Sequence, residues 1–220
     1  MNIINLSFPV KGTYLPADHN YRLHGALCTE IPTLNKLEHF AVNTIAGRPD
    51  QHGKIQLLKG SRLLLRLPVE EIAQVYSLAG KTLMIDGYSI QLGNPELQTL
   101  QPTDILSARL VTIKGYIEAD TFLDAAQRQL NTLEIQANLG IPANDKGEPK
   151  RLTLRITKPE RSYTIVGFSL VISDLSPDDS IKLQIRGLGG KRRIGCGVFN
   201  PVVNVYRKSR RDSHAAATIG

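Results

Sequence analysis

Residues 106–135 read LSARLVTIKGYIEADTFLDAAQRQLNTLEI, and this stretch carries the clearest signal of the fold. Its first part is rich in β-forming residues and predicts a strand over 106–117. Apolar residues then recur at spacings of three and four, which predicts an amphipathic helix over 119–135. The apolar side of this helix carries Phe122, Leu123, Ala126, Leu130 and Leu133. A strand followed by a helix therefore begins in the middle of the chain.

The residues that follow extend this start into a longer order of elements. A loop over 140–150 precedes two β-rich runs at 152–156 and 163–172. A short helix is predicted over 177–185 and a last strand over 194–199. The second half of the chain is thus predicted as strand, helix, strand, strand, helix, strand.

The first half is predicted to have the same order with one extra strand. In chain order, its elements are a strand over 3–10, a helix over 19–30 with Asp18 at its N-cap, an extended stretch over 41–46, strands over 54–59 and 62–67 joined by a tight turn at Gly60 and Ser61, a helix over 68–78, and a hairpin of 81–85 with 88–92. A stretch rich in Pro, Gln and Thr at 93–104 separates the two halves.

Two tandem copies of this order predict an α+β protein with two ferredoxin-like, or RRM-like, βαββαβ modules and antiparallel sheets. We expect an N-terminal module over residues 1–95 and a C-terminal module over 104–205. Residues 206–220 begin basic and have no apolar period, so a disordered basic tail is expected there. Because this fold supports many unrelated functions, the function has to be inferred from local residues.

The charge of the chain indicates a polyanionic partner. Its formal net charge is +7 and its sequence pI is about 9.5. From Arg186 to Arg211 the chain carries eight Lys and Arg residues and no Asp or Glu. Because the positive charge is concentrated near one end, a nucleic acid is the leading candidate for the partner.

The sequence gives no support for a membrane protein, a secreted protein or a protein that depends on a metal or another cofactor. The apolar runs are much shorter than the roughly 20 residues of a membrane-spanning helix, so no membrane is expected. The first ten residues lack the pattern of a secretory signal, and only Cys28 and Cys196 are present, so we expect a cytoplasmic protein with reduced thiols. No Cys, His or carboxylate cluster has metal-ligand spacing, so neither a metal nor another cofactor is expected.

The most informative segment for function is GLGGKRRIGCGVF, residues 187–199. Glycines allow positive φ and a close approach of the backbone to a ligand, so their N–H groups could point at phosphate oxygens. The neighbouring cations would bind a nucleic-acid backbone. The candidate RNA-binding residues are Arg186, Gly187, Gly189, Gly190, Lys191, Arg192, Arg193, Gly195 and Gly197. The alternative interpretation is a flexible loop in which the glycines serve only the turns.

This segment resembles the Gly-rich loop that closes the tandem ferredoxin-like endoribonucleases which process CRISPR repeats. The stretches LPADHNY (15–21) and SRLLLRLP (61–68) further resemble the branch of that family named after myxobacterial CRISPR systems. The resemblance implies cleavage of the repeat stem-loop of precursor RNA by 2′-hydroxyl attack, without a metal, to give mature crRNA that stays bound. It also implies other subunits of a CRISPR effector complex as partners.

The resemblance also supplies candidates for catalysis. In several members the working histidine lies in a Leu-His-x-x-Leu run before a proline, and Leu23-His24 in this chain matches that run. His24 is therefore the first candidate for general base or acid, and Tyr21, three residues earlier, would lie on the same helix face. His19 is the second candidate, although it would point about 140° away from His24 on a straight helix. His39 is a third candidate.

Three alternatives stay open at the level of sequence. His24 could be a partly buried residue that only packs, because it lies among apolar residues of its helix. The chain could be a non-catalytic RNA-binding subunit of a CRISPR complex or of another ribonucleoprotein. It could also be a structural component of an RNA–protein particle, such as a ribosomal protein, since charge and fold would be the same.

Overall fold

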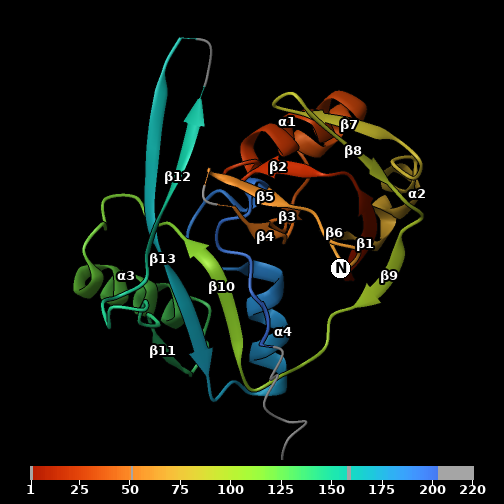
Figure 1. Cartoon of the computed structure of the whole chain (residues 1–220). Helices are drawn as coiled ribbons and strands as arrows, with labels where there is room; N and C mark the ends of the chain where they lie inside the picture. The colour runs from red at the N-terminus through yellow and green to blue at the C-terminus, as the bar shows by residue number, and fades with distance from the viewer. Residues whose placement is uncertain (1, 51, 158–159, 203–220) are drawn as a thin grey trace, which may run out of the picture.

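A computed structural model of the protein describes residues 2–50, 52–157 and 160–202 (Figure 1). The elements of the first half are β1 (Ile3–Lys11), β2 (Tyr14–Pro16), α1 (Asn20–Glu30), the 3-10 helix η1 (Pro32–Asn35), β3 (Ala41–Val42), β4 (Arg48–Pro49), β5 (Lys54–Gln56), β6 (Arg62–Pro68), the 3-10 helix η2 (Val69–Glu71), α2 (Ile72–Tyr76), β7 (Thr82–Ile85), β8 (Tyr88–Leu92) and β9 (Glu96–Thr99). Those of the second half are β10 (Leu106–Val111), α3 (Ala119–Thr132), β11 (Asn138–Gly140), β12 (Arg151–Thr157), β13 (Ser162–Ser173), α4 (Pro177–Arg186), the 3-10 helix η3 (Arg192–Ile194) and β14 (Asn200–Pro201).

Both halves have the strand order of a ferredoxin-like sheet, so the predicted fold class is confirmed. The first sheet runs β3-β6-β1-β8-β7, and the second runs β11-β13-β10-β14. In the first sheet β1 lies between β6 and β8, and in the second β10 lies between β13 and β14. These are the positions of the first, third and last strands of a βαββαβ motif, and the neighbouring strands are antiparallel. Strand β9 also pairs with β1, and β12 with β13. The module boundaries at 95 and 104 stay a prediction, and residues 206–220 lie outside the described residues.

Local sequence explains why the helices of the second half form where they do. Helix α3 turns Phe122, Ala126 and Leu130 into the core and leaves its polar side in solvent. Helix α4 begins at Pro177 after Ser176, whose side chain accepts a hydrogen bond from the backbone N–H of Asp179 at 3.1 Å. This N-cap, a proline at the first position and acidic residues in the first turn are typical signals for a helix start.

Two large apolar cores lie one in each half, and a third cluster joins them. The first core contains residues between 4 and 92, and the second contains residues between 106 and 199. The third cluster consists of Leu110, Leu154, Ile156, Ile165, Ile194 and Cys196, with Tyr21, Leu152 and Tyr163 packed against it. Because Tyr21 comes from α1, this cluster ties the first half to the second.

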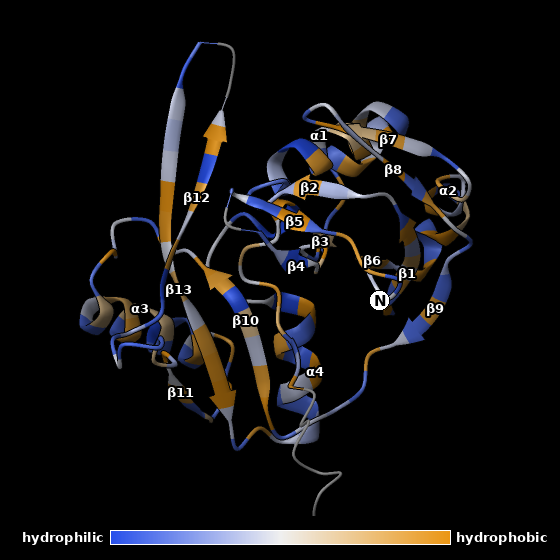
Figure 2. Ribbon diagram, viewed as in Figure 1, coloured by the Kyte–Doolittle hydropathy of each residue, from blue (hydrophilic) through white to orange (hydrophobic). Residues whose placement is uncertain are grey.

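Strands β12 and β13 form a long hairpin whose outer part extends beyond the rest of the molecule (Figure 1). Figure 2 shows hydrophobic residues along the part of β13 that lies in the sheet, a paler outer part of β13, and a hydrophobic outer end of β12. Near the outer end of β12 the hairpin touches the first half, because the backbone N–H of Arg155 donates to the carboxylate of Asp18 at 3.2 Å.

Two predictions for the first half are corrected. Helix α1 begins at Asn20 with His19, not Asp18, as its N-cap. The predicted hairpin of 54–59 with 62–67 is wrong, because β5 pairs with β2 and β4 in a separate small sheet. Strand β6 has β1 and β3 on its two sides, so neither edge is free for β5.

The predicted last strand over 194–199 is also wrong. Its start belongs to η3, and Gly195 and Gly197 have positive φ, which a strand does not accommodate. The strand that closes the second sheet is β14, after this segment. Strand β9 was not predicted, since its residues lie in the Pro- and Gln-rich stretch between the halves.

Arg66 on β6 is the central polar contact between the halves. Its side chain is fully buried and donates hydrogen bonds to Asn5 Oδ1 (3.0 Å), the carbonyl oxygens of Gln184 (2.7 Å) and Phe199 (2.9 Å), and Asn200 Oδ1 (3.0 Å). Burial lowers its pKa to about 9, with a smaller contribution from Arg192, so the guanidinium is charged at neutral pH. Asn200 in turn donates to Asn43 of the first half at 2.7 Å.

Within the described part of the chain, no helix is both long and apolar enough to span a bilayer. Both cysteines are free thiols, with Cys28 half-buried and Cys196 buried.

Replacing Arg66 by Ala is expected to lower the free energy of unfolding by about 3 kcal/mol or more, because three buried acceptors and one half-buried acceptor lose their donor. The matched control is Arg62→Ala on the same strand, whose partner Glu96 is exposed and lies at 3.2 Å. That change is expected to cost about 0.5 kcal/mol. Urea denaturation of the three proteins measures both values, and equal small losses would contradict the role assigned to Arg66.

Candidate functional site

The Gly-rich loop, residues 187–199, follows α4 and packs against β10 and α1. All five candidate glycines donate their backbone N–H to the protein itself. The bonds are Gly187 to Leu183 O (2.8 Å), Gly189 to Gln129 Oε1 (2.7 Å), Gly190 to Thr112 O (3.0 Å), Gly195 to Arg192 O (3.0 Å) and Gly197 to Leu110 O (2.8 Å). The expectation that these N–H groups point at phosphate oxygens is therefore corrected.

The backbone of the loop needs glycine for its own packing at most of these positions. A Cβ on Gly197 would overlap the carbonyl oxygen of Leu188, and one on Gly189 would overlap that of Thr112. Both residues also have positive φ. Gly190 differs, because its φ is not positive and an added Cβ would meet nothing within 4 Å. Packing therefore accounts for the other candidate glycines but leaves Gly190 unexplained.

The basic side chains of the loop differ in how far they reach solvent. Arg186 and Lys191 are exposed. Arg192 is half-buried and donates to Gln184 O at 3.4 Å, and burial lowers its pKa to about 10. Arg193 is half-buried and donates to Leu37 O at 3.0 Å. In the structure as described, the buried Nε atoms of both arginines have no hydrogen-bond partner.

A small basic cavity of about 310 Å³ lies beside these arginines. Its walls are Leu37, His39 and Phe40 from the first half and residues 189–193 from the loop. His39 has a positive φ of 56° and is half-buried. An imidazole and three cationic side chains thus surround one hollow, which suits an anion.

Helix α1 brings His24 next to the loop. The backbone of the loop is anchored to this helix by Asn20, whose side-chain amide donates to Ile194 O at 3.1 Å. His24 is half-buried, and its pKa is lowered by burial and, less strongly, by the positive charge of Arg193. Its Nε2 lies 3.5 Å from the sulfur of Cys28, one turn further along the helix. The lowered pKa keeps His24 mostly neutral at neutral pH, and the positive charge of Arg193 acts on it.

His19 lies in a different environment from His24. Its side chain is only 1% exposed, and its Nδ1–H donates to Pro16 O at 2.8 Å. Its Nε2 accepts the backbone N–H of Ile45 at 3.2 Å. Burial is the main cause of its lowered pKa. Both ring nitrogens are thus used inside the protein.

The structure separates the three candidates for catalysis on α1. Tyr21 is half-buried against the apolar cluster that contains Ile194 and Cys196, while His24 lies against Cys28 and is influenced by the charge of Arg193. His19 is enclosed at the start of the helix. The arrangement favours His24 as the candidate with a cation beside it and a partly accessible ring.

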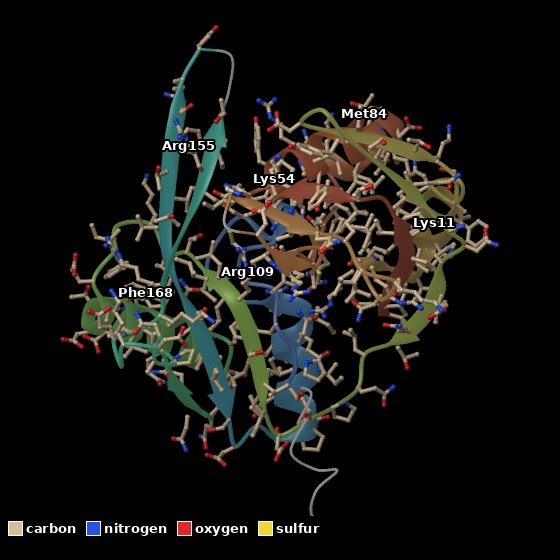
Figure 3. The ribbon with its side chains drawn as sticks, in the orientation of Figure 1. Lys11, Lys54, Met84, Arg109, Arg155 and Phe168 are labelled. Carbon is tan, nitrogen blue, oxygen red and sulfur yellow. The ribbon has the colours of Figure 1, made fainter. Side chains whose placement is uncertain are left out.

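Two arginines near the junction of the halves had no signal in the sequence. Arg109 lies exposed on β10, and its charge acts on both His19 and Cys196. Arg155 lies on β12 and lines a small cavity with Asp18 and Tyr21. Figure 3 shows Arg109 and Arg155 around this junction and Lys11 at the edge of the first half farthest from the hairpin in this view.

Among the described residues, no group of three or more His, Cys, Asp or Glu side chains is placed to hold a metal ion.

Comparison with known proteins places these features in a family. The model of the family described as Cas6 Crispr matches residues 4–204. The "CRISPR-associated endonuclease Cas6" of Myxococcus xanthus (strain DK1622) is 35% identical over 217 residues, which cover 99% of this chain and 88% of that protein.

Solved structures agree in fold. A "CRISPR associated protein Cas6" is similar with a TM-score of 0.60 and 13% identity, over 91% of this chain and 99% of the other. A second structure, described as a RAMP protein binding different RNA substrates, has a TM-score of 0.58 and 14% identity, over 92% of this chain and 100% of the other. At these identities the likeness concerns the fold alone.

The two kinds of glycine in the loop are expected to respond differently to alanine. Gly197→Ala should lower the free energy of unfolding by about 2 kcal/mol or more, because its φ is positive and its Cβ position is occupied by backbone. Gly190→Ala should leave stability within about 0.5 kcal/mol of the parent protein, since its Cβ position is open. Chemical denaturation of both variants checks this, and an equal response would show that the loop is packed differently.

Proposed function

The chain belongs to the Cas6 family, and from this premise we propose that it is an endoribonuclease that binds the stem-loop of CRISPR repeat RNA and cuts it without a metal. The name of the Myxococcus relative, a CRISPR-associated endonuclease, supports the reaction class. The observation that carries the proposal is the position of His24, a neutral imidazole beside Arg193 where α1 meets the Gly-rich loop.

The chemistry that these residues can supply is general acid–base catalysis. The 2′-hydroxyl next to the scissile phosphate attacks the phosphorus atom, loses its proton to a base, and expels the 5′-oxygen, which takes a proton from an acid. The products are a 2′,3′-cyclic phosphate and a 5′-hydroxyl. His24, neutral because its pKa is lowered, can accept the proton of the 2′-hydroxyl. The lowered pKa keeps this base active at more acidic pH than a solvated histidine.

Cations near His24 can stabilise the charge that develops on the phosphorane. Arg193 acts on His24 and also lines the small basic cavity with Lys191 and His39. A phosphate in that cavity would meet the positive charge of Arg193, which lines it. His39 is the candidate for the acid, because it lines the same cavity. Tyr21 is proposed to orient the substrate from the same helix, and His19 to hold the start of that helix in place.

RNA binding is assigned to the exposed cations of the loop rather than to its glycine amides. Arg186 and Lys191 reach solvent, while Arg192 and Arg193 are held by carbonyl oxygens and present only part of their charge. The glycines act indirectly, because they let the loop backbone fold against β10. Retention of the cut RNA, association with further subunits of a CRISPR effector complex, and a cytoplasmic location belong to the same proposal.

Cleavage of repeat RNA in EDTA tests the proposal. The parent protein is expected to give a product with a 5′-hydroxyl end, and His24→Ala to reduce the rate by about 10²-fold or more while binding stays unchanged. His52→Ala is the matched control, because that residue is exposed in a loop. Intact RNA with the parent protein would favour the non-catalytic RNA-binding subunit, and an unchanged rate with His24→Ala would move the role to His39 or His19.

Salt dependence tests the assignment of Lys191 to the RNA backbone. Lys191→Ala is expected to weaken binding of repeat RNA and to reduce the slope of log K against log salt by about one. Lys11→Ala, at the far edge of the first half, should leave the slope unchanged (Figure 3). The triple replacement of Lys191, Arg192 and Arg193 should have a larger effect than Lys191→Ala. If affinity survives the triple change, RNA binds elsewhere on the protein.

A further inference from the structure

A second cavity, of about 630 Å³, lies in the second half on the other side of Gly190. It is formed by the turn that follows β10, by β13 and by the Gly-rich loop. None of His19, Tyr21, His24 and His39 lines it. The catalytic proposal therefore leaves this cavity without a role, although its volume is within the usual range for small-ligand sites.

The wall of this cavity is unusually apolar for an exposed surface. Ile113, Ile117, Tyr163 and Ile165 contribute to it. Ile117 is 49% exposed, and Tyr163 is half-buried with its ring 5.9 Å from the guanidinium carbon of Arg161. An exposed apolar hollow with an aromatic side chain and a neighbouring arginine suits a flat, π-rich ligand.

The rim of the cavity is positively charged. Lys114 and Lys191 line it and are both exposed, and the lining includes no Asp or Glu. Among the salt bridges between described residues, neither lysine takes part. An apolar wall with a cationic rim complements a nucleotide, whose base is flat and apolar on its faces and whose phosphate is anionic.

Gly190 lies between this cavity and the small basic cavity. Together with Gly189 and Lys191, it lines both. A Cβ on Gly190 would project into open space, so nothing in the packing of the protein requires glycine there. A polynucleotide that passes over Lys191 could place a phosphate in the basic cavity and reach the apolar one with a neighbouring base.

We propose that the apolar cavity binds one unpaired nucleobase of the RNA, with Lys114 and Lys191 against the phosphates on either side. This rests on the proposed function only in naming RNA as the ligand. The base stacks on the apolar wall that includes Ile117 and Tyr163, and the glycine at position 190 leaves room for it. The site recognises a base that is not paired, because only a splayed base exposes its faces to a pocket.

Two oligomers of equal charge separate base binding from phosphate binding. One is a fluorescein-labelled oligoadenylate of about 12 nucleotides, and the other has the same length with abasic spacers in place of every nucleotide's base. The parent protein is expected to bind the oligoadenylate roughly tenfold more tightly. Ile117→Asp should abolish most of this preference, and Gly190→Val should reduce it by narrowing the cavity.

Met84→Asp is the matched control, because Met84 is 61% exposed but lies on β7 in the other half. It should keep the full preference, and circular dichroism melting should show all three variants folded as the parent. Equal binding of both oligomers by the parent protein, or an unchanged preference in folded Ile117→Asp, would overturn the inference. Either result can occur while repeat RNA is still cleaved in EDTA, and a failure of cleavage alone would count only against the proposed function.

Discussion

The buried hydrogen bonds of Arg66 hold together the parts on which the site depends. One guanidinium, carried by a central strand of the first sheet, satisfies a carbonyl near the end of α4 and another just before β14. The Gly-rich loop lies between these two points in the chain, so both of its ends are fixed to the first half. Desolvating a guanidinium is costly, so such a contact is stable only when its donors find partners, and here each of the three nitrogens of Arg66 has at least one.

The glycine N–H groups of the loop make hydrogen bonds within the protein and not with a ligand. These bonds let the loop backbone lie close to β10 and α1. As a result, Arg193 comes beside His24, although the two residues are far apart in the sequence. The glycines thus determine where the basic side chains of the loop stand, and in the proposed function these side chains contact the RNA backbone.

Sequence patterns predicted what depends on neighbours in the chain. Helix α3 and the closing hairpin of β7 and β8 follow from apolar spacing and a tight turn, and the repeated order of elements predicted both sheets. The partners of β5, the fate of the glycine N–H groups and the enclosure of His19 could not be predicted, because each depends on contacts with distant segments. Arg109 and the cavity at Ile117 gave no local signal for the same reason.

The third apolar cluster has a consequence for how a ligand is received. It packs Leu154 and Ile156 of the hairpin against Ile194 and Cys196 of the loop and against Tyr21 of the first helix. Three surfaces from distant parts of the chain are thereby set in one arrangement before any partner arrives. The entropy of ordering these surfaces is lost when the chain folds, so it is not lost again when a ligand binds.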